Sequence, residues 1–323
     1  MIRKLTAIFL CLAIFFIDLL NYSRLSRKPL LFRSFTGLAL SEFDSIYMEI
    51  ESRYPKYEVK RLSKSKRIRQ VGAGNHFKLQ VRDRFLMLLV YYRMYITHTL
   101  SGFLFDLDQS NIYRDIRHIE PLVKQCIPFP QKLYNLTRRL RTVEEVEKYF
   151  PEFKAFIDVT EQEIQRPKDN KKKREYYSGK KKRHTVKTQY MVNKEGEILY
   201  KSRHHKKGRQ HDYTVYKDEQ PQTPSQVENV LDLGYLGCEK DFPTVKYSLP
   251  VKKKRNMELT EEQIEYNKNH SRLRVIIEHT ICRIKKFCIM GTKYRNRLKR
   301  YDHISDIVSG LVNYRIMKNS VLP

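Results

Sequence analysis

The chain has 323 residues, about two domains of ordinary size, and 41% of them are hydrophobic, which excludes a wholly disordered chain. There are 64 Lys and Arg residues against 36 Asp and Glu, a formal net charge of +28. So basic a chain favours contact with a polyanion, and the contact should weaken with added salt. Nucleic acid is therefore the first candidate partner, and an acidic membrane surface is the second.

The first 21 residues form an apolar N-terminal segment. Residues 5–17 are uncharged and hydrophobic and follow Arg3 and Lys4, as in a signal peptide. The run is shorter than the ~20 apolar residues of a membrane span, and Asp18 interrupts it. A buried helix, or a start codon placed too far upstream, is the simpler interpretation. The five scattered cysteines contain no C-x-x-C pair, which is typical of reduced thiols. We expect a cytoplasmic, nucleoid-associated protein without stable membrane association.

Residues 22–127 are predicted to form a helical DNA-binding region. Apolar side chains recur at helical spacing from Arg84 to about Ile96, and residues 97–105 predict a second, short helix. A tight turn at 106–108 leads into a third helix that begins at Gln109. This succession is a helix-turn-helix, in which the second helix of the pair enters the major groove of DNA.

The helix from Gln109 has one apolar and one polar face. Ile112, Ile116 and Ile119 are expected to face the core. The exposed candidates for contact with base edges are Gln109, Ser110, Asn111, Arg114 and Arg117. An ordinary helical bundle with a polar outer face is the alternative that the pattern leaves open.

The hydrophobic period changes in the second half of the chain, where residues 151–323 are predicted to form a mixed-sheet α/β domain. Pro128 and Pro130 interrupt the helical pattern, so we expect a linker over residues 128–150 that ends in a short helix. Strands are expected at 153–159, on both sides of a turn at 194–196, at 227–235, and from residue 244. A long helix should run from about Thr260, in capping-box register with Gln263, to Phe287.

Acids at the ends of the predicted strands are unusual in so basic a chain. Asp158 closes the first strand and Asp232 the fourth. Glu278 lies in the long helix on one face with Arg274 and Lys285, because four residues advance ~400° and eleven advance ~1100°. We place Glu278 at the rim of the buried stripe, where a carboxylate between two cations suits metal ions and phosphate. A turn cap, a strand exit and a solvated helix face are the alternatives for the three acids.

The sequence from residue 153 to 313 resembles the catalytic region of the DDE transposases of bacterial insertion sequences, in particular the subgroup with an N-terminal helix-turn-helix. The matching stretches include IDVTEQEIQRPKD, GRQHDYTVYK, DLGYLG and NHSRLRVIIEHTICRIKKF. The last carries the family's R-(3)-E-(6)-K signature as Arg274, Glu278 and Lys285. Where the family pattern has Tyr three residues before that Arg, this chain has Ser271.

The resemblance implies a ribonuclease H-like fold in which Asp158, Asp232 and Glu278 are catalytic and hold two divalent cations, normally Mg²⁺, with Mn²⁺ as an alternative. It implies that Arg274 and Lys285 hold the phosphates of the element end. The implied function is a transposase, acting as a homo-oligomer on double-stranded DNA, that binds terminal inverted repeats, cleaves a strand and transfers it to target DNA. A catalytically inactive or domesticated DNA-binding protein is the alternative.

Two further groups of residues could serve the same site. The basic runs Lys171 to Arg174 and Lys180 to Arg183 could line a DNA channel, or could form a solvated loop. His211 and Asp212 could support the acids, although a helix N-cap is the simpler role for Asp212.

Overall fold

The computed structural model describes residues 20–63, 70, 73 and 76–320 of a chain that divides into two compact units, Met1–Cys126 and Ile127–Pro323. The apolar run at residues 5–17 lies outside the described residues. Among the helices that are described, none is long and apolar enough to cross a membrane.

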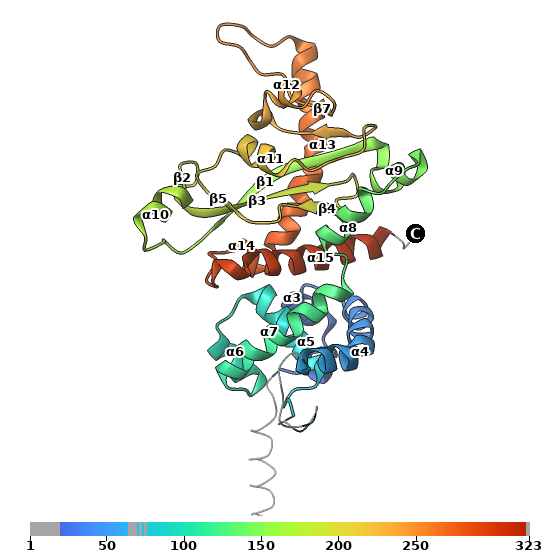
Figure 1. Cartoon of the computed structure of the whole chain (residues 1–323), viewed down its shortest axis with the longest axis vertical. Helices are drawn as coiled ribbons and strands as arrows, with labels where there is room; N and C mark the ends of the chain where they lie inside the picture. The colour runs from blue at the N-terminus through green and yellow to red at the C-terminus, as the bar shows by residue number, and fades with distance from the viewer. Residues whose placement is uncertain (1–19, 64–69, 71–72, 74–75, 321–323) are drawn as a thin grey trace, which may run out of the picture. The chain divides into compact units, whose positions relative to one another are not determined.

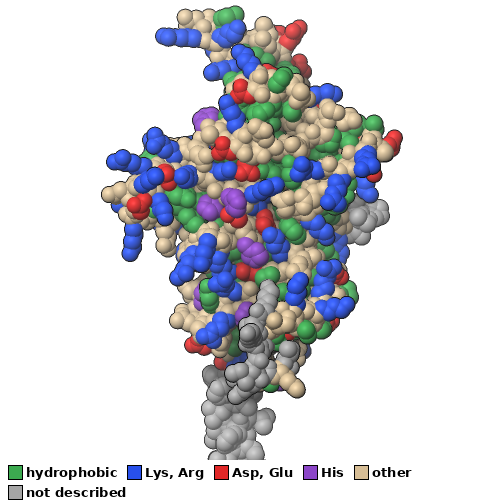
Figure 2. All heavy atoms as spheres, viewed as in Figure 1, with side chains coloured by type: hydrophobic (Ala, Val, Ile, Leu, Met, Phe, Trp, Pro, Cys, Tyr) green, Lys and Arg blue, Asp and Glu red, His purple; other side chains and the backbone are tan. Residues whose placement is uncertain are grey.

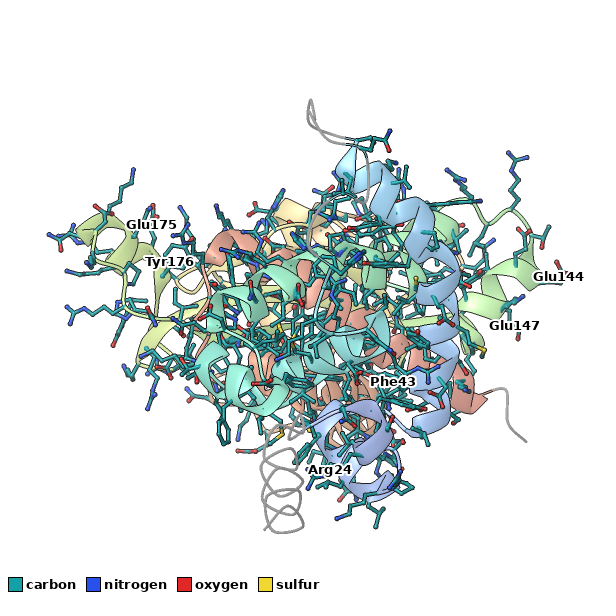
Figure 3. All side chains as sticks on the ribbon, turned by 90° about the horizontal axis from the view of Figure 1, so that it is seen from below. Arg24, Phe43, Glu144, Glu147, Glu175 and Tyr176 are labelled. Atoms are coloured by element: carbon teal, nitrogen blue, oxygen red, sulfur yellow. The ribbon has the colours of Figure 1, made fainter. Side chains whose placement is uncertain are left out.

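The first unit is built from helices (Figure 1). These are α2 (Tyr22–Leu25), α3 (Pro29–Thr36), α4 (Leu40–Leu62), α5 (Val81–Met94), α6 (His98–Phe105) and α7 (Gln109–Cys126). Helix α5 is the centre of the unit, because every residue from Arg84 to Tyr92 is buried. Phe43 of α4 stacks on Phe85 of α5, with 4.7 Å between the ring centroids (Figure 3). The first unit therefore has a core of its own.

A buried ion pair joins α5 to α7. Arg84 is only 2% exposed, and its Nε lies 3.6 Å from Oδ2 of Asp115. Its Nη1 donates to the hydroxyl of Tyr54 at 3.0 Å, and the guanidinium lies 3.7 Å from the ring centroid of Phe77. Burial raises the pKa of Asp115, and the charge of Arg84 opposes that shift. Each charge therefore depends on the other to remain buried.

The second unit contains a mixed sheet of seven strands (Figure 1). The strands are β1 (Lys154–Glu163), β2 (Tyr177–Ser178), β3 (Arg183–Val192), β4 (Ile198–Lys201), β5 (Lys206–Lys207), β6 (Glu228–Val230) and β7 (Lys246–Ser248). Their order is β2-β3-β1-β6-β7, and β4 and β5 also pair with β3. Strands β1, β6 and β7 are parallel, whereas β3 is antiparallel to β1. This arrangement confirms the predicted α/β, ribonuclease H-like fold.

Helices cover both faces of this sheet. They are α8 (Pro130–Thr137), α9 (Val143–Tyr149), α10 (Asn170–Tyr176), α11 (Asp212–Glu219), α12 (Cys238–Asp241), α13 (Glu261–Lys285), α14 (Cys288–Gly291) and α15 (Tyr301–Ser320). Of the short 3₁₀ turns, η1 (Pro151–Phe153) precedes β1, η2 (Leu233–Tyr235) follows β6, and η3 (Leu298–Arg300) precedes α15. Figure 1 shows the long helix α13 running across the strands. On the same face, the hydroxyl of Tyr190 in β3 lies 3.1 Å from that of Ser305 in α15.

Residues 128–150 form two packed helices: α9 lies where the short helix at the end of the linker was expected, whereas α8 was not expected. Pro130 stands at the start of α8, a position where its missing N–H costs nothing. Leu133 and Tyr134 of α8 and Val146 of α9 belong to the core cluster that covers one face of the sheet. The proline that suggested a break in the sequence is therefore the start of a helix.

Strand β1 is longer than the sequence suggested. It pairs with β3 from Phe156, opposite Val192, to Glu163, opposite Thr185. Asp158 therefore lies inside the strand and does not close it. The partner strand, which is distant in sequence, sets this length.

Candidate active site

The parallel pairing of β1 with β6 brings Asp158 and Asp232 together. The register aligns Phe156 with Val230 at the end of β6. Continued by two residues, it places Asp158 opposite Asp232. The chain leaves the sheet after β6, so two acids that are distant in sequence meet just beyond the end of β6, next to β1.

Asp158 is largely shielded from water, with 21% of its side chain exposed. Its Oδ1 accepts a hydrogen bond from the amide of Val159 at 2.8 Å, and its Oδ2 lies 3.5 Å from Nη2 of Arg274 in α13. Burial raises the pKa of Asp158 to about 6; Arg274 opposes the shift, and the charges of Asp232 and Asp212 add to it. The site therefore concentrates negative charge that a bound cation would stabilise.

Asp232 is fixed by the turn that follows it. Its Oδ1 accepts a hydrogen bond from the amide of Gly234 at 2.5 Å, which makes Asp232 the N-cap of η2. A Cβ at Gly234 would lie 2.8 Å from the same oxygen. The Asp-Leu-Gly sequence thus fixes the orientation of this carboxylate.

Two polar atoms beside the acids are buried without a hydrogen-bond partner among the described residues. They are the hydroxyl of Tyr235 and Nε of Arg274. The pKa of Tyr235 lies well above its usual value because of burial first, and then because of Asp158, Asp212 and Asp232. The sequence analysis did not single out Tyr235, although the signal was its place in DLGYLG, three residues after an acid.

Asp212 has a different role from the one expected. The N-cap of α11 is His211, whose Nδ1 accepts from the amide of Tyr213 at 3.4 Å. Asp212 instead accepts a hydrogen bond from Nζ of the buried Lys187 at 2.8 Å. Lys187 also lies 3.6 Å from Oε1 of Glu161, so its single charge is shared by two carboxylates. The negative charge of Asp212 also contributes to the raised pKa of Asp158.

Helix α13 supplies the basic residues of the site. Thr260 and Gln263 form the predicted capping box, with reciprocal hydrogen bonds of 3.3 and 3.2 Å. Arg274, with 15% of its side chain exposed, lies against Asp158. The pKa of Lys285 is lowered because the surrounding protein excludes water from its ammonium group and because Lys181 is near, while Asp158 opposes the shift.

Glu278 is exposed to solvent, which corrects its expected position at the rim of the buried stripe. The buried residues of this part of α13 are Ile277, Ile281 and Ile284. Glu278 follows Ile277 by ~100° around the helix, which is enough to turn its side chain out of the packed face.

Among the described residues, Asp158, Asp232 and Glu278 do not gather into a metal site with three protein ligands. In the part of the chain that the structure describes, no three His, Cys, Asp or Glu side chains gather closely enough to hold a metal ion. Asp158 and Asp232 are together, and Glu278 does not complete a group with them. The guanidinium of Arg274 supplies the positive charge next to Asp158. Carboxylate oxygens are the donors that Mg²⁺ and Mn²⁺ prefer, so the residues present fit a divalent cation.

The predicted helix-turn-helix is formed by α6 and α7 in the first unit. A Cβ at Gly102 of α6 would lie 2.4 Å from the carbonyl oxygen of Leu107, so this glycine permits the close turn. Asp106 ends α6 in the left-handed conformation, with φ of 49°. As expected, Ile112, Ile116 and Ile119 are buried, and the exposed residues of α7 include Gln109, Ser110, Asn111, Arg114 and Arg117.

Side-chain contacts orient the basic residues of α7. Nη1 of Arg114 donates to Oδ1 of Asn111 at 3.1 Å, and Nη1 of Arg117 donates to the hydroxyl of Tyr113 at 2.8 Å. The guanidinium of Arg117 also lies 5.5 Å from the ring centroid of Tyr113. Both guanidinium groups are therefore held at the exposed face of α7.

Comparisons with known proteins match both units. Residues 77–129 match the family described as the helix-turn-helix of DDE superfamily endonuclease, and residues 157–313 match the DDE superfamily endonuclease family. A relative from Microchaete diplosiphon, "Probable transposase for insertion sequence element IS702", is 32% identical over 248 residues, 75% of this chain and 83% of the relative. The chain belongs to the DDE-superfamily transposases of insertion sequences. No solved structure matches the transposase.

Family membership gives each unit of the transposase a role. The helix-turn-helix family covers α6 and α7, which implies that this unit binds DNA. The endonuclease family covers the sheet from β1 to α15, including Asp158, Asp232 and Glu278. The transposase is thus a DNA-binding helical unit joined in sequence to an endonuclease unit.

Proposed function

We propose that the transposase binds the terminal inverted repeats of its own insertion sequence, cleaves the donor phosphodiester and joins the released 3′-hydroxyl to target DNA. The observation that carries this proposal is the meeting of Asp158 and Asp232 on neighbouring parallel strands beside Arg274. Two carboxylates next to a guanidinium can hold both a cation and the phosphate that the cation activates.

Asp158 and Asp232 would hold the divalent cations, Mg²⁺ or Mn²⁺, with Glu278 as the third ligand. Glu278 lies between Arg274 and Lys285 on one face of α13, and both of these cations interact with Asp158. This shared strip of α13 supports Glu278 as the proposed third ligand. When bound, such a pair of cations lowers the pKa of an attacking water or hydroxyl and stabilises the leaving oxygen.

The basic residues of α13 position the DNA strand. Arg274 uses one of its five N–H groups against Asp158, and its Nε has no partner among the described residues. The remaining donors suit phosphate oxygens in a planar, bidentate geometry. Lys285 adds a second positive charge about two turns after Glu278. Together they hold the strand with its scissile phosphate near the carboxylates.

The exposed face of α7 reads the element end. Gln109, Ser110 and Asn111, in its first turn, are placed to contact base edges, and Arg114 and Arg117 contact bases or phosphates. The two ends of an element are recognised together by copies of one chain, so we propose a homo-oligomer on DNA. Its site of action is the cytoplasm, on the nucleoid.

Alanine variants of the acids test this function. Asp158→Ala, Asp232→Ala and Glu278→Ala should each lose Mg²⁺-dependent cleavage of labelled element ends and keep their affinity for those ends. Glu147→Ala is the matched control, because Glu147 is an exposed acid of the same unit that projects from α9 (Figure 3). Cleavage at the wild-type rate by any of the three acid variants contradicts the assignment.

A further inference from the structure

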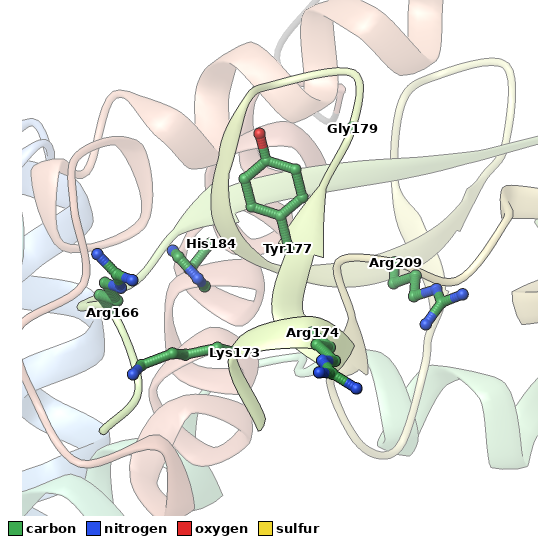
Figure 4. A pocket seen from close by; sticks show the side chains of 7 residues that line it. All are labelled: Arg166, Lys173, Arg174, Tyr177, Gly179, His184 and Arg209. Carbon is green, nitrogen blue, oxygen red and sulfur yellow. The ribbon is translucent and has the colours of Figure 1, made fainter. Parts of the chain in front are cut away.

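A pocket of about 670 Å³ lies beyond the end of β1, several residues after Asp158 (Figure 4). Its lining includes four cationic side chains, Arg166, Lys173, Arg174 and Arg209, and two aromatic ones, Tyr177 and His184. They come from the segment after β1, from α10 and β2, from the start of β3, and from the loop before α11. Figure 2 shows Lys and Arg side chains crowded on the surface at the left, which α10 and β2 form in Figure 1.

The four cations of this pocket are not neutralised within the protein. Among the described residues, none of them forms an ion pair, and no carboxylate lines the pocket. Neighbouring cations differ in this respect. Lys207 lies 3.0 Å from Glu175, an acid at the end of α10 (Figure 3), and Arg183 lies 2.6 Å from Glu163. The positive charge of the pocket is therefore available to an anionic partner outside the protein.

The aromatic side chains give the pocket an uncharged wall. Tyr177 is 42% exposed, and its ring meets that of His184 edge to face, with 5.7 Å between the centroids. The pKa of His184 is lowered by partial burial and by the charges of Arg166 and Lys173, so the imidazole is neutral at neutral pH. A surface that alternates cations with aromatic faces suits a chain of phosphates joined by apolar deoxyribose rings.

Strand β1 connects the acids to the pocket. The strand leads from Asp158 to Glu163, and Arg166 follows shortly after its end. Ile164, whose amide donates to the carbonyl of the lining residue His184, is six residues after Asp158, and Arg166 is eight residues after it. At ~3.3 Å per residue, these residues lie about 20 and 26 Å from Asp158. One DNA strand advances ~3.4 Å per nucleotide, so this separation equals about six to eight nucleotides.

We propose that this basic pocket grips the sugar–phosphate backbone of the element-end DNA about six to eight base pairs from the scissile phosphate, independently of sequence. The inference rests on the proposed function, because it assumes that a DNA strand is cleaved at Asp158 and Asp232. It adds a second anchor in the endonuclease unit, apart from the helix-turn-helix and from α13.

Binding of full-length protein to element-end duplexes at several salt concentrations tests the anchor. For Arg166→Ala/Arg174→Ala we expect about tenfold weaker binding or more, and a slope of log K against log salt that is smaller in magnitude by about two. The loss should be equal on a duplex of unrelated sequence. Arg138→Ala/Arg139→Ala is the control of equal charge, since both arginines are exposed in the same unit beyond α8 and do not line the pocket. An unchanged slope for the pocket variant overturns the inference.

Neutral backbone linkages locate the contact. A single methylphosphonate about six to eight nucleotides from the cleaved bond should weaken binding by the wild-type protein and have no effect on Arg166→Ala/Arg174→Ala. Equal sensitivity of the two proteins at every linkage overturns the inference. Inorganic phosphate at constant ionic strength should not displace the DNA; if it does so for the wild type and not for the variant, the pocket is a free-anion site instead.

These results separate the two proposals. A wild-type protein that neither binds nor cleaves element ends contradicts the proposed function. A wild-type protein that cleaves them, with a pocket variant that keeps the wild-type slope, contradicts the backbone anchor alone.

Discussion

Among single residues, Asp158 is the clearest case of a group whose ionised form is unfavourable in the metal-free protein. Burial and neighbouring acids raise its pKa from 3.8 to about 6, although Arg274 opposes the shift. The folded state therefore binds a proton more tightly than the unfolded chain does. Stability from this group is present below pH ~4 and is lost as the pH rises through ~6, because the folded state then holds an unfavourable charge.

Asp158→Asn should therefore stabilise the metal-free protein above pH ~6, by on the order of 1 to 3 kcal/mol. At pH ~3 the difference from wild type should nearly vanish, since both folded and unfolded Asp158 are then largely protonated. Urea unfolding in the presence of a chelator, at these two pH values, measures both quantities. A variant that is less stable than wild type at neutral pH would contradict the account.

Tyr235 offers a second prediction, because its buried hydroxyl lacks a partner among the described residues. Tyr235→Phe should leave the free energy of unfolding unchanged or raise it by up to about 1 kcal/mol. Tyr216→Phe is the matched control: the hydroxyl of Tyr216 lies 3.0 Å from that of Tyr247, so its loss should cost about 1 kcal/mol. If both variants lose the same stability, the Tyr235 hydroxyl is hydrogen-bonded.

At the scale of elements, α5 and α7 depend on the buried pair of Arg84 and Asp115. Arg84→Ala leaves a buried carboxylate without its cation and should reduce the stability of the first unit by about 3 to 5 kcal/mol. Replacing both residues, as in Arg84→Met/Asp115→Leu, should recover most of that loss, since neither charge is then buried. Helical circular dichroism during urea unfolding provides the measurement, and additive losses in the double variant would refute the coupling.

The sequence was sufficient to predict the elements that local patterns define. The spacing of Phe85, Leu88 and Leu89 predicted α5, and the turn at 106–108 predicted the helix-turn-helix. Thr260 and Gln263 predicted the start of α13. In each case the hydrogen bonds or the buried face involve residues within a few positions of one another, so the pattern is visible in a single segment.

Features set by distant partners were not predictable in this way. The length of β1 depends on its pairing with β3, and the packing of α8 depends on a sheet that follows it in sequence. Glu278 was placed at the edge of the buried stripe from its helical angle, but the width of the stripe depends on what packs against α13. Tyr235 became notable only when the structure showed its neighbours.

Over the whole chain, positive charge lies on the surfaces that we propose contact DNA. The net charge of +28 is spread over both units. Among the described residues, the four cations of the pocket next to α10 form no ion pair, whereas Arg274 of α13 lies beside Asp158. Such a distribution supports the proposed sequence-independent contact with DNA, to which we propose that α7 adds recognition of bases.

The proposed function requires Asp158, Asp232 and Glu278 to act together on one DNA phosphate. The most direct test is the rate at which full-length Asp158→Asn, Asp232→Asn and Glu278→Gln cleave a labelled element end in Mg²⁺, with DNA affinity measured in parallel. We expect each change to slow cleavage by about a hundredfold or more and to leave DNA affinity nearly unchanged. Glu278→Gln cleaving as fast as wild type, while the two aspartate variants are inactive, would show that the third ligand lies elsewhere in the chain.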